Sequence, residues 1–200
     1  MFNESIHAYP LIDIYETLKA NKKADKEHQE QLLSALIPCV FDEILITFDA
    51  KERKEYPIPV RKDGKCGLVK PDRAATPVTP FKYDLLFREP YTDYVKYIAV
   101  LDGKYGVVNT EGKEIIPCIL DNIFQRQDTD GFLPVLKDGK WGIFTDCEMF
   151  IYPKFDELAI RSEDYLRARI GSRWGWVTEK GNLSNNKRHA VFGSWYDDSK

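Results

Sequence analysis

Four aspartates recur at one position of a repeated pattern, and they are the carboxylates of this chain that most resemble catalytic groups. Asp42, Asp84, Asp121 and Asp156 each follow a proline and bulky apolar residues, in "PCVFDEI", "PFKYDLL", "PCILDNI" and "PKFDEL". A carboxylate can act as a general acid or base. One that appears once per repeat is instead typical of a group that accepts backbone N–H bonds at a bend. We therefore predict a structural role for all four, with the adjacent Glu43 and Glu157 solvated.

The remaining groups that could do chemistry do not form a recognised motif. The histidines, His7, His28 and His189, all lie outside the repeats. No nucleophile elbow, phosphate-binding loop or His-Glu-x-x-His metal motif appears. We expect no catalytic residue, no cofactor and no enzyme activity. The alternative left open is an enzyme with an unrecognised site, in which His189 would lie beside one of the repeated aspartates.

The cysteines do not have the spacing of a metal site. No two of them form a Cys-x-x-Cys pair, and no histidine is close to one in sequence, so we predict no bound metal. Two of the four occupy the same repeat position, which favours a packing role. We expect buried free thiols. The four are Cys39, Cys66, Cys118 and Cys147.

The repeat is clearest when the chain is aligned on a glycine that follows an aromatic residue. The aligned stretches are "IPVRKDGKCGLV", "YIAVLDGKYGVV", "LPVLKDGKWGIF" and "RARIGSRWGWV". Their anchor glycines, Gly67, Gly106, Gly142 and Gly175, are spaced 39, 36 and 33 residues apart. Because the aspartate pattern alternates with this one in register, we infer four repeats, over residues 37–71, 79–110, 114–146 and 149–181.

Each repeat contains a turn sequence and then a gap in a strand. Asp-Gly between apolar runs is a strong hairpin signal, because glycine adopts positive φ freely and aspartate tolerates it. Gly64, Gly103 and Gly139 should therefore lie at hairpin tips, with Gly171-Ser172 as the fourth turn. The lysines that follow, Lys65, Lys104 and Lys140, should point to solvent. The anchor glycine leaves a gap in the strand surface.

We expect that gap to be covered by the aromatic residue of a repeat or by the proline segment of the next one. The aromatic position itself, Trp141 and Trp174 in the last two copies, should lie in the core. A second hairpin should follow the anchor strand of copy two, as "NTEG" indicates after Val108, with Asp146, Cys147 and Glu148 as its equivalent in copy three.

These elements predict a mainly β fold. Each repeat reads as three antiparallel strands: a long strand with the proline and aspartate, such as residues 114–127, broken near the proline; a strand ending at the Asp-Gly tip; and the aromatic-glycine strand. One such unit has little core, so neighbours must stack. We expect four three-stranded units in a twisted array or arc. A closed propeller-like ring is the alternative, for which four units of three strands are few.

The repeats resemble the WG-repeat family, named for its Trp-Gly pair. The resemblance rests on "DGKWG" from Asp138, "DGKYG" from Asp102, "RWGW" from Arg173, and "NTEGKEIIPCILDNI" from Asn109. It covers about residues 37–181, and the first copy departs from it by placing Cys66 where the aromatic residue belongs. The family is broadly bacterial and is defined by repetition, not by a shared reaction. The resemblance therefore implies a repeat scaffold and transfers no catalytic residues.

The two ends do not match the repeat. Helix-forming residues with apolar residues on one face predict helices over residues 9–20 and 24–36, which make residues 1–36 a helical cap for the array. Pro10 would suit a first helical turn. Residues 182–200 should form a final strand or a covering tail. The N-terminus lacks the basic and apolar regions of a secretory signal, and no apolar run is long enough to span a bilayer, so we expect a cytoplasmic protein.

Composition and exposed aromatics limit the function. Aromatic residues make up 13% of the chain and the net charge is −3, so nothing attracts a nucleic-acid backbone. We expect a non-catalytic scaffold that binds another protein. The alternative is a small ligand or carbohydrate bound through exposed aromatics. The candidate binding residues are Trp176, Trp195 and Tyr91, although Trp176 also fits a place in the core beside Trp174.

Overall fold

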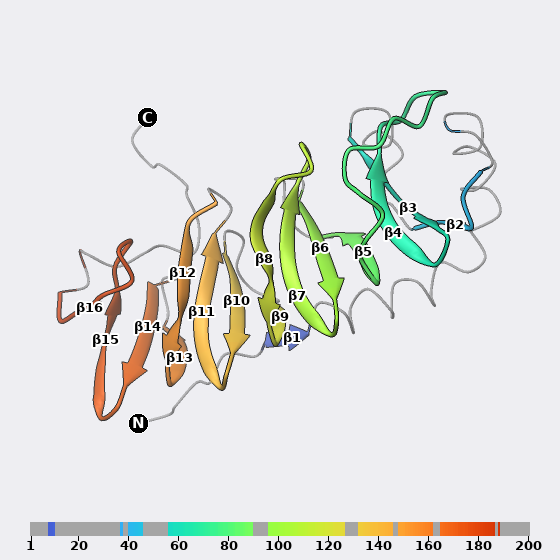
Figure 1. Ribbon diagram of the computed structural model, residues 1–200. Helices are drawn as coiled ribbons and strands as arrows, with labels where there is room; N and C mark the ends of the chain where they lie inside the picture. The colour runs from blue at the N-terminus through green and yellow to red at the C-terminus, as the bar shows by residue number, and fades with distance from the viewer. Residues whose placement is uncertain are drawn as a thin grey trace, which may run out of the picture. The chain divides into compact units, whose positions relative to one another are not determined.

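The architecture is all β throughout the part of the chain that the structure describes (Figure 1). The computed structural model describes residues 8–10, 37, 40–45, 56–89, 96–126, 132–145, 148–161, 165–186 and 188. These residues form sixteen strands in four antiparallel sheets of three to five strands. Within them, no helix has the length and apolar character that a membrane crossing would require. The mainly β fold is thus confirmed, and it contains four sheets, but these sheets are not uniformly three-stranded.

The strands follow one another along the chain within each sheet. The first sheet contains β2 (Glu43–Ile44), β3 (Ile58–Lys62) and β4 (Lys65–Val69), and the second contains β5 (Leu85–Arg88), β6 (Lys96–Leu101), β7 (Lys104–Asn109) and β8 (Glu114–Leu120). The third contains β1 (Ala8–Pro10), β9 (Asn122–Arg126), β10 (Phe132–Lys137), β11 (Lys140–Thr145) and β12 (Phe150–Phe155), and the fourth contains β13 (Glu157–Arg161), β14 (Tyr165–Ile170), β15 (Arg173–Val177) and β16 (Leu183–Ser184). Only β1 joins its sheet out of chain order.

The chain divides into two compact units, each containing two of the sheets. One unit is Ile12–Ile119 and the other is Met1–Leu11 with Leu120–Lys200. In the first unit, buried side chains of the first sheet (Cys66, Leu68) pack with those of the second (Leu86, Tyr97, Ala99, Val108). In the other unit, Ile143 and Phe155 of the third sheet pack with Leu158, Leu166, Ala168 and Val177 of the fourth. Each of these cores therefore lies between two consecutive sheets.

The hairpin tips have the backbone conformation that Asp-Gly requires. Asp138 and Gly139 have φ of 51° and 70°. In the other two Asp-Gly pairs, both residues also have positive φ. Two consecutive residues with positive φ are typical of a type I′ turn, whose twist matches that of the flanking strands. The predicted tips are therefore confirmed in the three copies that contain Asp-Gly.

In three of the four copies, a second turn follows the strand that contains the anchor glycine. Asn109 N–H donates to the Lys113 carbonyl, and Thr145 N–H donates to that of Met149 in the same way. Thr178 N–H and the Asn182 carbonyl form the third pair. The hairpin predicted from "NTEG" therefore recurs, although copy three makes its turn with Glu148 at a positive φ.

The long proline-containing strand is divided at the aspartate and not near the proline. β8 ends at Leu120 and β9 begins at Asn122, and the two strands belong to different sheets. The same break separates β12 from β13 at Asp156. Since Pro117 and Pro153 lie within β8 and β12, their missing N–H groups are tolerated inside the strand. The predicted site of the break was wrong, and Asp121 and Asp156 mark the places where the chain leaves one sheet for the next.

The anchor glycines allow two backbones to come unusually close. A Cβ atom on Gly142 would lie 2.5 Å from the Ile151 carbonyl oxygen and 2.8 Å from Pro153 N. One on Gly106 would lie 2.6 Å from the Ile116 carbonyl oxygen. The strand opposite these two glycines is the following proline segment, which is one of the two covers that we predicted, whereas Gly175 faces Leu183 and Ser184 of β16. The close approach at Gly142 coincides with a shift in the pairing of β11 and β12 between Trp141 and Ile143.

The N-terminal expectation is wrong at its first residues. Tyr9 and Pro10, where the first helix was predicted to begin, lie in β1, which pairs antiparallel with β9. Proline suits such a strand because β1 lies at the edge of its sheet and one side of it needs no hydrogen-bond donor. The rest of the predicted helical cap, and the tail beyond residue 188, lie outside the described residues.

The close approach at Gly142 predicts a large cost for one added methyl group. We expect Gly142→Ala to lower the free energy of unfolding by about 2–3 kcal/mol, because backbone atoms at 2.5 and 2.8 Å must move apart. The control is Gly139→Asn, where nothing lies within 4 Å and asparagine tolerates positive φ, so the loss should stay below about 1 kcal/mol. Urea denaturation of both variants measures this. Equal losses would contradict the packing role of Gly142.

Candidate functional site

The most regular polar feature of the structure is a contact between each repeated aspartate and the hairpin tip of its own sheet. We call Asp42, Asp84, Asp121 and Asp156 the clamp aspartates. Asp84 Oδ2 accepts a hydrogen bond from Asp102 N–H at 2.8 Å, and Asp121 Oδ2 accepts one from Asp138 N–H at 2.6 Å. The other two accept from Gly64 N–H at 3.2 Å and Gly171 N–H at 2.6 Å. These four bonds agree with the expectation that the carboxylates serve backbone N–H groups at a bend.

A second hydrogen bond aligns each clamp aspartate with the strand that leads to the tip. The backbone N–H of Asp121 donates to the Leu136 carbonyl at 2.8 Å, and that of Asp156 donates to the Arg169 carbonyl at 2.8 Å. Asp42 and Asp84 make the same bond in their sheets. Each clamp aspartate therefore holds both its strand and its turn, and it does so immediately before a strand of its own sheet begins.

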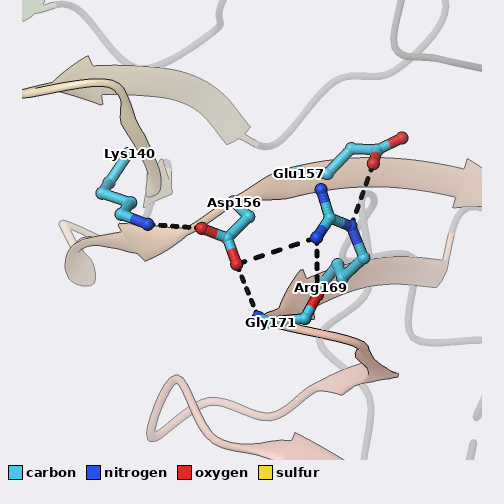
Figure 2. Close-up of polar contacts among 5 residues, drawn as sticks. All are labelled: Lys140, Asp156, Glu157, Arg169 and Gly171. Carbon is cyan, nitrogen blue, oxygen red and sulfur yellow. Dashed lines mark hydrogen bonds and ion pairs between the residues drawn. The ribbon is translucent and has the colours of Figure 1, made fainter.

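The other carboxylate oxygen of two clamp aspartates binds a lysine from the preceding sheet. Lys65 Nζ lies 2.6 Å from Asp84 Oδ1, and Lys140 Nζ pairs with Asp156 Oδ1 (Figure 2). Both lysines lie at hairpin tips and their side chains are about half exposed. The lysines are exposed, as predicted, and the ammonium groups of Lys65 and Lys140 also connect one sheet to the next.

These contacts lower the pKa of the carboxylates that make them. The pKa of Asp84 is held below its usual value by the hydrogen bond from Lys65 and then by that from the Asp102 N–H. The pKa of Asp156 is lowered in the same way by Lys140 and the Gly171 N–H. In both residues the two carboxylate oxygens are already engaged. A carboxylate in that state favours its ionised form and is a poor proton donor.

The first and last sheets share an additional ion pair that the two middle sheets lack. Arg61 Nε lies 3.3 Å from Glu43 Oε2, and Arg169 Nε lies 3.2 Å from Glu157 Oε2. Each arginine also donates to the carbonyl of a tip glycine, Gly64 or Gly171 (Figure 2). The two glutamates are therefore half-buried and paired, and the prediction that they are solvated was wrong.

A readable signal for these pairs existed in the sequence. Glutamate follows the clamp aspartate only in copies one and four, and arginine occupies the cross-strand position only in the same two copies. The middle copies place Leu85 opposite Val100 and Asn122 opposite Leu136. The two positions thus change together, as expected for residues in contact.

Arginine and tryptophan meet on one face of the fourth sheet. Arg167 on β14 is opposite Trp176 on β15, and its Cζ atom lies 5.1 Å from the ring centre of Trp176 and 5.8 Å from that of Trp174. All three side chains are half-buried. A guanidinium at such distances from a ring is attracted by the negative face of the aromatic system. Sequence reasoning identified the two tryptophans but missed Arg167.

Only one of the three predicted binding residues lies in the described part of the chain. Trp176 is half-buried, which is intermediate between the core and the exposed readings, and it shares a face with Trp174 as predicted. Tyr91 and Trp195 lie outside the described residues. The structure thus brings Trp176 together with Trp174 and Arg167.

The described thiols are in environments that favour the protonated form. Burial raises the pKa of the Cys66 thiol, and burial raises that of Cys118 to about 11. Both cysteines are free. Their sulfur atoms contact the carbonyl oxygens of Asp84 and Ala99. Within the described ranges, no three His, Cys, Asp or Glu side chains gather where they could hold a metal ion.

Four sheets with recurring clamps define a β-repeat protein, and comparison with protein families identifies the repeat. The family model described as WG containing repeat matches residues 105–141. That stretch begins at the aromatic residue of copy two, Tyr105, and ends at the aromatic residue of copy three, Trp141. Residues 105–141 are therefore similar to the WG containing repeat, in agreement with the resemblance seen in the sequence. No curated protein and no solved structure shows significant similarity to the chain.

The clamp hydrogen bond should contribute measurably to stability. We expect Asp121→Ala to lower the free energy of unfolding by about 1–2 kcal/mol, because the Asp138 N–H loses a charged acceptor. Asp121→Asn should lose less, since its amide oxygen can still accept. Glu111→Ala, at an exposed turn, is the control and should change little. If Asp121→Ala and Asp121→Asn lose the same free energy of unfolding, an uncharged acceptor does not help. The contribution of Asp121 would then come from its charge and not from the hydrogen bond to the turn.

The lowered pKa of Asp84 predicts a specific acid sensitivity. A carboxyl group whose pKa is lower in the folded than in the unfolded state stabilises the fold above its unfolded pKa of about 3.9. That contribution is lost as the pH falls through the folded pKa. Stability should therefore decline less steeply below about pH 5 in Asp84→Asn than in the parent protein.

Urea midpoints measured from pH 6 downward test this, with Glu111→Gln as a control that should follow the parent profile. Because the side chain of Asp84 is 41% exposed, the difference should shrink at high salt. Identical pH profiles for the parent and Asp84→Asn would refute the role of this ion pair.

Proposed function

We propose that this chain is a non-catalytic repeat scaffold that binds another protein. The observation that carries the proposal is the use of its recurring reactive groups. Asp84 and Asp156 each have one carboxylate oxygen on a tip N–H and the other on a lysine. A general base needs an accessible lone pair and a pKa near the working pH. The carboxylates most often repeated in the chain are therefore committed to holding sheets and turns together.

The architecture also supports a binding role. Within each compact unit two consecutive sheets share a core, so each unit can present several hairpins and loops on one framework. We propose that the four sheets form a twisted array or arc, that residues 1–36 cap one end of it, and that the protein works in the cytoplasm. The mild acidity of the chain, with a net charge of −3, argues for a protein partner over a nucleic acid.

A second candidate function is the binding of a small ligand or carbohydrate through aromatic rings. Trp174 and Trp176 favour it, because both are half-buried on one face of the fourth sheet. Sugar rings stack on indole faces, and binding would change the tryptophan fluorescence. A saturable change on titration with monosaccharides or cell-wall fragments would favour this reading over the protein partner.

Affinity capture from a lysate of the native host tests the scaffold role. The immobilised full chain and the folded control Gly139→Asn should both retain the same protein at physiological salt. Gly142→Val should retain less of it, since the added side chain separates β11 from β12. The scaffold proposal fails if the parent chain and Gly139→Asn retain no protein beyond what Gly142→Val also retains.

A further inference from the structure

One face of the fourth sheet differs from the same face of the other sheets. Trp176 occupies the repeat position of Leu68 and Ile143, and Arg167 occupies that of Pro59 and Pro134. Leu68 and Ile143 are fully buried in the cores that join their sheets to the next one. We call the surface formed by Arg167, Trp174 and Trp176 the terminal face, because the described residues contain no sheet after the fourth.

The two arginines of this sheet that lie beside the tryptophans are in opposite electrostatic situations. Arg169 is neutralised by Glu157, 3.2 Å from its Nε, and lies 3.9 Å from Asp156. The Nε atom of Arg167 is buried and has no hydrogen-bond partner in the part of the chain that the structure describes. A buried donor without a partner costs free energy, and more when it belongs to a charged group. Arg167 therefore has hydrogen-bonding capacity that the fold itself does not use.

The chemistry of a ligand for this face follows from those groups. The planar guanidinium fork binds a carboxylate with two parallel hydrogen bonds, and the aromatic rings beneath it hold its plane in place. The half-buried ring of Trp174 adds apolar surface next to the charge. An apolar ligand alone would leave the arginine unsatisfied, and a small anion alone would leave the ring uncovered.

We propose that the terminal face binds an acidic, extended segment of a partner protein. An Asp or Glu carboxylate of that segment pairs with Arg167, and a neighbouring apolar side chain covers Trp174. This proposal rests on the scaffold function and names the surface and the partner chemistry. A second copy of the chain fits less well, because a two-fold contact through this face would place Arg167 against its own symmetry mate. Like charges at such a contact are unfavourable.

A random dodecapeptide display library, selected on the immobilised full chain, tests the proposal. The enriched peptides should contain Asp or Glu next to an apolar or aromatic residue. Arg167→Met keeps the length of the side chain and removes its charge, so it should weaken binding of a selected peptide roughly 10- to 100-fold. Arg173→Gln removes a charge from an exposed position of the same sheet and should leave the affinity unchanged.

Thermal unfolding separates binding from folding. Because Arg167→Met removes a buried donor that has no partner, its melting temperature should equal or exceed that of the parent. A lower melting temperature together with unchanged peptide affinity would show that Arg167 serves the fold, and the proposal would be wrong.

The remaining outcomes are equally decisive. Enriched peptides that bind Arg167→Met as well as the parent would place the binding surface elsewhere, which overturns this inference and leaves the scaffold function intact. Binding only by the double variant Asp197→Asn/Asp198→Asn would show that the chain's own C-terminal acids occupy the face, which overturns the partner. No enrichment at all overturns the inference for this face, while capture from the host lysate decides the scaffold function independently.

Discussion

The fold depends on the hydrogen bonds of the aspartate that stands between one sheet and the next. Asp121 separates β8 from β9, and its main chain and side chain hold the strand and the tip of the sheet that it enters. At Asp84 and Asp156 the same carboxylate also binds a lysine of the sheet that the chain has just left. At these two positions a single aspartate thus connects a strand and a hairpin tip of one sheet with a lysine side chain of the preceding sheet. Within each compact unit, the two consecutive sheets share an apolar core.

In the same sheet, the anchor glycine and the proline of the neighbouring strand allow two strands to pack closely. Gly142 has no Cβ, which leaves room for the backbone of β12, and Pro153 has no N–H whose partner would be displaced there. The two residues therefore complement each other across the strands. This explains why the repeat needs glycine at one fixed place, while the residue before it varies and is Trp141, Tyr105 or Cys66.

Local signals in the sequence predicted the tips, the clamps and the close packing at the anchor glycines, because each depends on residue type at a fixed spacing. The break at Asp121 was not predicted, because apolar residues flank Asp121 and Asn122 on both sides in "KEIIPCILDNIFQ" and the stretch reads as one long strand. The partners of Lys140 and Arg167 depend on which residues the folded sheets bring together. The pairing of Glu157 with Arg169 could have been predicted from the sequence. Glutamate at the first position and arginine at the second occur together in copies one and four and in neither middle copy.

The fourth sheet has features that stop the stack from growing by another copy of the same kind. Its outer strand, β16, has only two residues, where β8 and β12 have seven and six, so little edge remains for pairing. A further sheet packed as the fourth packs on the third would have to enclose Arg167 within an apolar core. The desolvation of an unpaired guanidinium opposes that arrangement. This is consistent with the proposal that an acidic segment covers this face, because an ordinary repeat with apolar residues at these positions would bring no negative charge.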